Sequence, residues 1–384
     1  MQNIWRWFWY SGLIVVACVA TIAQIDRHAL EAPSLTYLVP DRFRNFALIR
    51  QAATEAETGV PNKAVADARR LVALHPIPAE NLTILAIAEH KAGNDKRSAD
   101  ALTLAAQRGW REPLAQRSVA LAAAGSGEGD MAADRLIALW KTSTGRPYAY
   151  NLTPTLLDEP GIRTHFAFML ESGESWGRLF LKWGSINLSS PVFVDVIEKA
   201  SSNGSAFDCV FIARKARSIL ETGSLALATR LWVSQCGSES LSFSKSLEFS
   251  DFRSRDNKQQ GPFSWVFPAA AGIRVTEHIN NGSNGIDFEN RDPIRRILSK
   301  KYLSLTPGKH VVRFHADDIL PSSLPILLRF GCHGAKAKVH VQSIVPKDTE
   351  SSMEFEVPHE GCEVQSVVLV VGQGEGKNVR FSID

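Results

Sequence analysis

The sequence of 384 residues lacks the motifs by which many enzymes and metal-binding proteins are recognised. It has no P-loop, none of its five cysteines forms a CxxC pair, and its ten histidines show neither HxH nor HExxH spacing. It also lacks any block of like charge, since 43 basic and 40 acidic residues leave a net charge of +3. These absences predict no catalytic residues, no cofactor and no metal, and they disfavour binding to nucleic acid.

One long apolar run is present, at the N-terminus. The 19 residues over 7–25 carry no charged side chain. Amphipathic rings, which prefer a headgroup layer, crowd its start: Trp5, Trp7, Trp9 and Tyr10. As a helix rising about 1.5 Å per residue, the run spans roughly the 30 Å of a bilayer's hydrocarbon core. We therefore expect residues 1–28 to be a signal-anchor that crosses a bacterial inner membrane once, through residues 7–25, with the bulk of the chain in the periplasm.

Two alternatives remain open for this segment. Val15-Val16-Ala17-Cys18 resembles a lipoprotein signal box, which would make Cys18 a lipid-modified N-terminus, although the chain stays apolar after this cysteine. Cleavage to a soluble exported protein is the other alternative. All three interpretations export the rest of the chain.

Three columns of small residues recur every 34 residues in the first third of the chain. They are Ala52, Ala86 and Ala120; Gly59, Gly93 and Gly127; and Ala64, Ser98 and Ala132. This period is typical of the tetratricopeptide (TPR) repeat, in which two helices cross closely at small side chains. We expect the glycines to adopt the left-handed turn that ends the first helix of each repeat.

The period is lost beyond Trp140 and returns once, in what looks like a closing helix hairpin with Ala216, Gly223, Ala228 and Trp232. We therefore expect a TPR-like α-solenoid over residues 40–245. Repeats of this type commonly hold an extended peptide or a helix of a protein partner in their groove. By repeat position alone, the candidate partner-binding residues are Arg50, Glu89 and Arg117.

From about Gly261, helical periodicity gives way to alternation. Alternating runs at 263–267, 302–305, 310–314, 324–330, 338–341, 353–357 and 364–371 predict about eight strands separated by turns. We expect a jelly-roll-like antiparallel β-sandwich over residues 261–384, after a linker at 246–260. The chain is thus a multidomain α + β protein. The aromatic side chains of residues 263–267 are expected in the core rather than on a sugar-binding surface, and Thr306–Gly308 is expected to be the hairpin turn between two strands.

Four of the cysteines lie outside the apolar run and allow three pairings. Cys209 and Cys236 fall at opposite ends of the expected helix hairpin, and Cys332 and Cys362 fall at strand ends. We expect the disulfides Cys209–Cys236 and Cys332–Cys362, because an exported chain meets an oxidising compartment. Four buried free thiols are the alternative.

The C-terminal region resembles a known family. It has a Pro-Phe-x-Trp entry at 262–265, a Leu-x-Pro-Gly turn at 305–308, a Phe-Gly-Cys strand end at 330–332, and a Val-Pro…Gly-Cys-x-x-Gln close at 357–365. With the order of anchor, repeats and sandwich, these motifs resemble membrane-anchored TPR proteins of alphaproteobacteria, which are often found beside exopolysaccharide biosynthesis genes. The resemblance implies a cell-envelope setting and brings no catalytic residues.

Three functions are compatible with the sequence. The first is a non-catalytic envelope scaffold or adaptor whose solenoid binds protein partners in exopolysaccharide biosynthesis or export. The alternative is a polysaccharide-binding protein that acts through the β-sandwich. The third is an envelope glycosidase or lyase, because Asp287 and Glu289 share a predicted strand face at a spacing suited to paired carboxylates.

Overall fold

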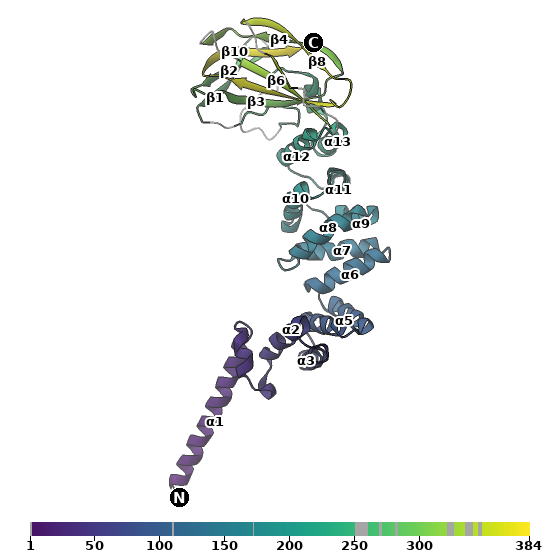
Figure 1. Ribbon diagram of the computed structural model, residues 1–384, viewed down its shortest axis with the longest axis vertical. Helices are drawn as coiled ribbons and strands as arrows, with labels where there is room; N and C mark the ends of the chain where they lie inside the picture. The colour runs from purple at the N-terminus through teal and green to yellow at the C-terminus, as the bar shows by residue number, and fades with distance from the viewer. Residues whose placement is uncertain are drawn as a thin grey trace. The chain divides into compact units, whose positions relative to one another are not determined.

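The computed structural model describes residues 2–384 except 110, 172, 250–259, 269–270, 281–282, 321–325, 335–340 and 345–347. The expected strand at 338–341 and the linker at 246–260 therefore lie partly outside the described residues. The chain forms two compact units, Met1–Phe166 and Ala167–Asp384. The first is helical, and the second joins helices to two β-sheets (Figure 1).

The first unit begins with the apolar helix α1 (Gln2–His28), which is long and apolar enough over Trp5–His28 to cross a membrane. Two short 3-10 helices follow, η1 (Pro33–Leu38) and η2 (Asp41–Phe43). The buried carboxylate of Asp26, near the end of α1, accepts hydrogen bonds from the N–H groups of Asn45, Phe46 and Ala47 at 3.0, 3.0 and 2.9 Å. These are free donors at the start of the next helix, so Asp26 caps that helix from a distance.

The three expected repeats form three pairs of helices. They are α2 (Phe46–Thr58) with α3 (Pro61–Leu74), α4 (Ala79–Lys91) with α5 (Asp95–Arg108), and α6 (Pro113–Gly125) with α7 (Gly129–Lys141). All six small residues of the outer columns are buried: Ala52, Ala64, Ala86, Ser98, Ala120 and Ala132. The close crossing inferred from the 34-residue period is therefore present.

The glycine column behaves as expected in two repeats of the three. Gly93 and Gly127 have φ of +78° and +82°, the left-handed conformation that ends a helix. The expectation is wrong for Gly59, whose φ is −81° and ψ −173°. Pro61 begins α3 and keeps the residue before it, Val60, extended at φ −76° and ψ 130°, so both residues between α2 and Pro61 are extended. The chain leaves α2 through an extended link instead of a left-handed turn.

Helix pairing continues beyond the point where the sequence period is lost. The first unit adds α8 (Arg146–Asp158) and most of α9 (Pro160–Phe168). The buried indole N–H of Trp140 donates to Thr153 Oγ1 on α8 at 3.0 Å. The second unit contains α10 (Ser175–Asn187), α11 (Ser190–Ser202), α12 (Cys209–Glu221) and α13 (Leu225–Cys236). The last two form the expected closing hairpin, with Gly223 at φ +81° between them.

Two antiparallel sheets form the C-terminal β-sandwich. One has the order β1 (Ile273–Asn280), β2 (Ser283–Asn290), β10 (Gly374–Ile383), β4 (Gly308–His315) and β8 (Glu350–Val357), with β5 (Asp318–Leu320) also paired to β10. The other has the order β3 (Arg296–Leu303), β9 (Val364–Val371), β6 (Ile326–His333) and β7 (Val341–Ile344). Inward side chains of both sheets share one core, which also contains Leu247 and Phe249 from the segment expected to be a linker.

Two expectations for the sandwich are wrong. Residues 263–267 form a turn with a single bridge at Val266, not a strand, because the Trp265 indole turns inward and donates to the carbonyls of Leu247 and Glu248 at 3.2 and 3.1 Å. The turn at 306–308 does not join paired strands, since β3 and β4 lie in different sheets. Phe263 and Trp265 are nevertheless buried, as expected for core residues.

Candidate functional site

A hollow of about 740 Å³ lies between α10 and α12 of the second unit. Its walls come from one face of each helix: Arg178, Leu181, Lys182, Ser185 and Ile186 on α10, and Phe211, Arg214, Lys215 and Ser218 on α12. Spacings of three and four residues place each set on one helical face. Residues 206–208, just before α12, complete the lining. We call this hollow the α10–α12 groove.

The floor of the α10–α12 groove is apolar. Leu181 and Phe207 are buried below it, and Phe211 is half-buried in its wall. At the rim, Ile186 is 77% exposed, which is unusual for so large an apolar side chain on a charged helix. The floor and rim together offer a surface on which a partner's apolar side chains can lose contact with water.

The rim of the groove is basic. Arg178, Lys182 and Arg214 are exposed, and none makes a side-chain hydrogen bond or ion pair with another described residue. Asp208 is the one acid of the lining, and its carboxylate is occupied by the N–H of Val210 at 3.0 Å. With three exposed cations and one acid in its lining, the groove presents a net positive charge above an apolar floor.

Lys215 is the fourth cation of the lining, and it is held in place. Its ammonium donates to the Ser185 carbonyl at 2.5 Å and lies 5.6 Å from the Phe193 ring centroid. Burial disfavours the charged form and lowers the pKa of Lys215 below its usual range. This lysine links α12 to α10 across the groove, so it fixes the spacing of the two walls.

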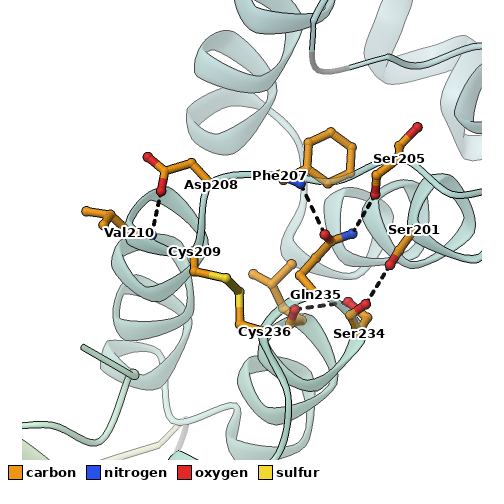
Figure 2. The surroundings of a disulfide bond; sticks show 10 residues. Ser201, Ser205, Phe207, Asp208, Cys209, Val210, Ser234, Gln235 and Cys236 are labelled. Carbon is orange, nitrogen blue, oxygen red and sulfur yellow. Dashed lines mark hydrogen bonds between the residues drawn. A yellow bond between two sulfur atoms is a disulfide. The ribbon is translucent and has the colours of Figure 1, made fainter. Parts of the chain in front are cut away.

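A disulfide anchors the start of α12 (Figure 2). Cys209 is joined to Cys236 at the end of α13, as the sequence predicted, with a Cα–Cα distance of 5.9 Å. Next to it, the Gln235 amide oxygen accepts the Phe207 N–H at 3.2 Å, and its nitrogen donates to the Ser205 carbonyl at 3.4 Å. These bonds hold the segment that carries Phe207 into the groove floor.

The other end of α12 is joined to the sandwich. Glu221 accepts hydrogen bonds from the Lys300 ammonium at 2.9 Å and the Tyr302 hydroxyl at 2.6 Å. Burial opposes ionisation of Glu221, but these two donors outweigh it and hold the pKa of the carboxyl below its usual range. Burial and the Glu221 charge raise the pKa of Tyr302.

A second contact joins α12 to the sandwich: a ring nitrogen of His333 lies 3.2 Å from the Glu221 carbonyl oxygen, beside the Cys332–Cys362 disulfide that the sequence predicted. The sandwich thus braces the helix that forms one wall of the groove.

The residues proposed from repeat position alone lie elsewhere, in the first unit. Arg50 is exposed on α2, and Arg117 is exposed on α6 with its guanidinium 5.8 Å above the Tyr148 ring. Glu89 does not fit a partner-binding role, because it is only 2% exposed. Its carboxylate accepts hydrogen bonds from the Arg69 guanidinium at 2.7 Å and from the Asn94 side-chain amide at 2.8 Å. Burial opposes its ionisation, but these donors prevail and lower the pKa of Glu89.

The α10–α12 groove was not predicted from the sequence. The sequence feature that could have indicated it is the pair of basic residues Arg178 and Lys182, which lie four residues apart on one face of α10. It was missed because the repeat register could not be followed through residues 142–208.

Two arrangements that suggest catalysis have the following surroundings in the structure. Asp287 accepts the Asn378 N–H at 2.8 Å and lies 3.1 Å from His278, and Glu289 pairs with Arg291 at 2.6 Å. The sequence also contains one Gly-x-Ser-x-Gly pattern, at 173–177, which the sequence-based reasoning overlooked. A nucleophile elbow needs a strand before the serine, whereas the helix α9 precedes it here.

The described aromatic residues of the sandwich point inward. Each of them between residues 260 and 384 is buried or half-buried, and none is among the large exposed hydrophobic residues. Sugar-binding surfaces commonly stack a ring face on the sugar, and the described part of the sandwich exposes no such ring. In the same described part of the chain, no three histidine, cysteine or acidic side chains converge to hold a metal ion.

No family model matches the chain, and no curated protein matches it. Among solved structures, "Crystal structure of MamA protein" is 17% identical over 49% of this chain and 97% of that chain, with a TM-score of 0.26. "Structure of TmCBM61 in complex with beta-1,4-galactotriose" is 13% identical over 32% and 89%, with a TM-score of 0.24. "Accessory secretory protein 1,2 and 3 in Streptococcus pneumoniae" is 13% identical over 30% and 85%, with a TM-score of 0.23. Likenesses this low carry no functional conclusion.

Proposed function

We propose that this protein is a non-catalytic scaffold of the cell envelope that binds a protein partner in the α10–α12 groove. The observation that carries the proposal is the set of three exposed, unpaired cations above an apolar floor. The matching chemistry is a peptide segment or helix in which acidic residues flank leucine, isoleucine or phenylalanine. Its apolar side chains would meet Phe211 and Ile186, and its carboxylates would meet Arg178, Lys182 and Arg214.

Three features support an exported, tethered location. α1 has the length and composition of a membrane span. Two disulfides suit an oxidising compartment. Asp26 and the partly buried Ile22 and Ile25 tie the end of α1 to the first repeat, which favours a helix that stays attached. Lipid modification at the exposed Cys18 would also keep these contacts and is the alternative form of tether.

The resemblance to envelope TPR proteins supports exopolysaccharide biosynthesis or export as the setting of this scaffold. Direct binding of polysaccharide by the sandwich is the weaker proposal, because its described phenylalanine, tyrosine and tryptophan rings are buried or half-buried. An acidic glycan in the basic groove is treated as an outcome of the test below.

The test is site-specific photocrosslinking in intact cells that naturally express the chain. A photoreactive amino acid replaces Ile186 at the rim of the groove. We expect an adduct with an envelope protein, and we expect its yield to fall about tenfold in the double variant Arg178→Glu and Lys182→Glu, as a loss of about 1.4 kcal/mol would produce. Lys309→Glu removes an exposed cation of β4 in the same unit and should leave the yield unchanged.

Two results would contradict the proposal. An adduct whose yield is the same in the charge-reversal and control variants would show that the basic rim does not select the partner. An adduct that resists protease and is destroyed by periodate would identify the bound molecule as a glycan.

A further inference from the structure

The segment that follows α1 folds back alongside it (Figure 1). Both η1 and η2 pack against α1. Leu35 of η1 lies across a hollow of about 370 Å³ from Ala20, Thr21 and Gln24 of α1. Ile25 and His28 complete the lining of this hollow, and Leu35 belongs to the same small core as Ile22 and Ile25, so η1 lies beside the last two turns of α1.

The folded-back segment turns large apolar side chains outward. Tyr37 is 84% exposed, Leu38 63% and Phe43 50%, whereas Thr36 and Val39 beside them are buried. We call Tyr37, Leu38 and Phe43 the juxtamembrane foot. Three such residues within seven positions make a patch, not the scattered exposure that is normal on a soluble surface.

The backbone that carries the foot is held firmly in this arrangement. The Arg44 guanidinium donates to the Val39 carbonyl at 2.8 Å, and that of Arg70 on α3 donates to the Asp41 carbonyl at 2.7 Å. Val39 packs with Ala29 and Ala47 in a small core between α1 and α2. The outward side chains are therefore presented by an ordered frame that already buries its inward ones.

The depth of the foot follows from the length of α1. A hydrocarbon core of about 30 Å takes about 20 helical residues, so a span that starts at Trp5 ends near Gln24. Leu35 lies beside the last two turns of α1, at residues 20–28, which places the foot at the far headgroup layer. The exposed charged side chains nearby are of both signs: Arg27 and Arg42, and Glu31 and Asp41, of which Asp41 pairs with Arg44.

We propose that the juxtamembrane foot inserts into the lipid headgroup layer of the leaflet through which α1 leaves the bilayer. The partner is a lipid surface, because the segment that carries the foot packs against the end of the membrane-spanning helix and exposes the aromatic and aliphatic side chains that settle at this depth. The proposal rests on the membrane tether described above. It gives the first repeat a second attachment, which limits its rotation about the axis of α1.

The test uses the full chain in vesicles of equal parts phosphatidylethanolamine and phosphatidylglycerol. Cys18→Ala removes the free thiol, and an environment-sensitive fluorophore is attached to a single new cysteine. Tyr37→Cys reports on the foot, Val15→Cys reports on the span, and Leu121→Cys on α6 is the water-exposed control, since Leu121 is 42% exposed. Lipids carrying a spin label near the headgroup or near the bilayer centre quench probes at each depth.

We expect the Tyr37 probe to show blue-shifted emission and to be quenched more by the shallow label than by the deep one. The Val15 probe should be quenched more by the deep label, and the Leu121 probe by neither. Adding Leu38→Asp and Phe43→Asp should abolish quenching at Tyr37 and leave it unchanged at Val15. If the Val15 probe is quenched while the Tyr37 probe behaves like the Leu121 probe, insertion of the foot is contradicted and the membrane tether is supported. If the Val15 probe is not quenched, both the insertion of the foot and the membrane tether are overturned.

Discussion

At the scale of single residues, spacing along the chain determines the structure of some positions, and contacts with distant segments determine that of others. The small residues of the 34-residue columns and the Cys209–Cys236 pair were predictable, because their spacing along a helix hairpin determines what they meet. The Cys332–Cys362 pair followed from the position of both cysteines at strand ends. Gly59 was not predictable, because in this repeat the link from α2 to Pro61 runs through extended backbone at Gly59 and Val60 instead of the left-handed turn of the other two repeats. Trp265 was placed on a strand face, but its hydrogen bonds to a segment 17 and 18 residues away override that pattern.

Glu89 provides a test at the scale of one residue. Its pKa in the folded chain lies below the ordinary value of 4.5, so the unfolded chain binds more protons in this range. The carboxylate therefore adds stability above pH 4.5, and the contribution is lost as the pH falls through the lowered pKa. We expect Glu89→Gln to destabilise the chain by about 1–3 kcal/mol at pH 7, because it leaves Arg69 poorly paired.

Urea unfolding between pH 7 and pH 3 measures this effect. The stability of Glu89→Gln should fall less steeply below pH 4.5 than that of the unaltered chain. Glu57→Gln, at an exposed site on α2, is the matched control and should change neither quantity. An unaltered stability and pH profile in Glu89→Gln would return this residue to the list of partner-binding candidates.

At the scale of elements, helix pairs were predictable only where the repeat period persists. Helices α8 to α11 were not located from the sequence period, because their contacts use larger side chains that do not follow the small-residue register. Examples are Trp140, which contacts Thr153, and the buried Phe180 and Phe193. The α10–α12 groove was missed for the same reason. Alternation located β4, β6, β8 and β9 and the end of β3, but it did not pick out β1, β2 or β10. The separation of β3 and β4 into two sheets depends on pairing partners far away in the sequence.

The hairpin of α12 and α13 gives a prediction at this scale. The Cys209–Cys236 bond closes a loop with a sequence separation of 27. Its removal in the double variant Cys209→Ser and Cys236→Ser should lower the free energy of unfolding by about 3 kcal/mol, because the unfolded chain regains the freedom that the cross-link removed. The start of α12 should also loosen, since Phe207 is held beside this bond.

Urea unfolding measures the loss of stability, and hydrogen exchange of residues 205–221 measures the loosening. Cys18→Ser alters the one free cysteine and should leave both unchanged. If the double variant keeps its stability and its exchange rates, the hairpin does not depend on the disulfide, and the groove floor must be held by the Gln235 contacts alone.

At the scale of the whole molecule, the sequence predicted the order of apolar helix, helical pairs and antiparallel sandwich, because each has its own period of apolar residues. The boundaries at residues 28, 40, 245 and 261 stay predictions. The burial of Leu247 and Phe249 in the sandwich core shows why such limits are hard to locate from composition: a loop of linker-like sequence can still supply core residues.

The groove and the foot have the proposed roles only if α1 carries the remainder of the chain across a membrane. The direct measurement is a dual reporter fused after Asp384, in which alkaline phosphatase folds only after export and a fluorescent protein emits only in the cytoplasm. An exported, tethered chain predicts active phosphatase in the membrane fraction of dark cells. Bright cells with inactive phosphatase would contradict it.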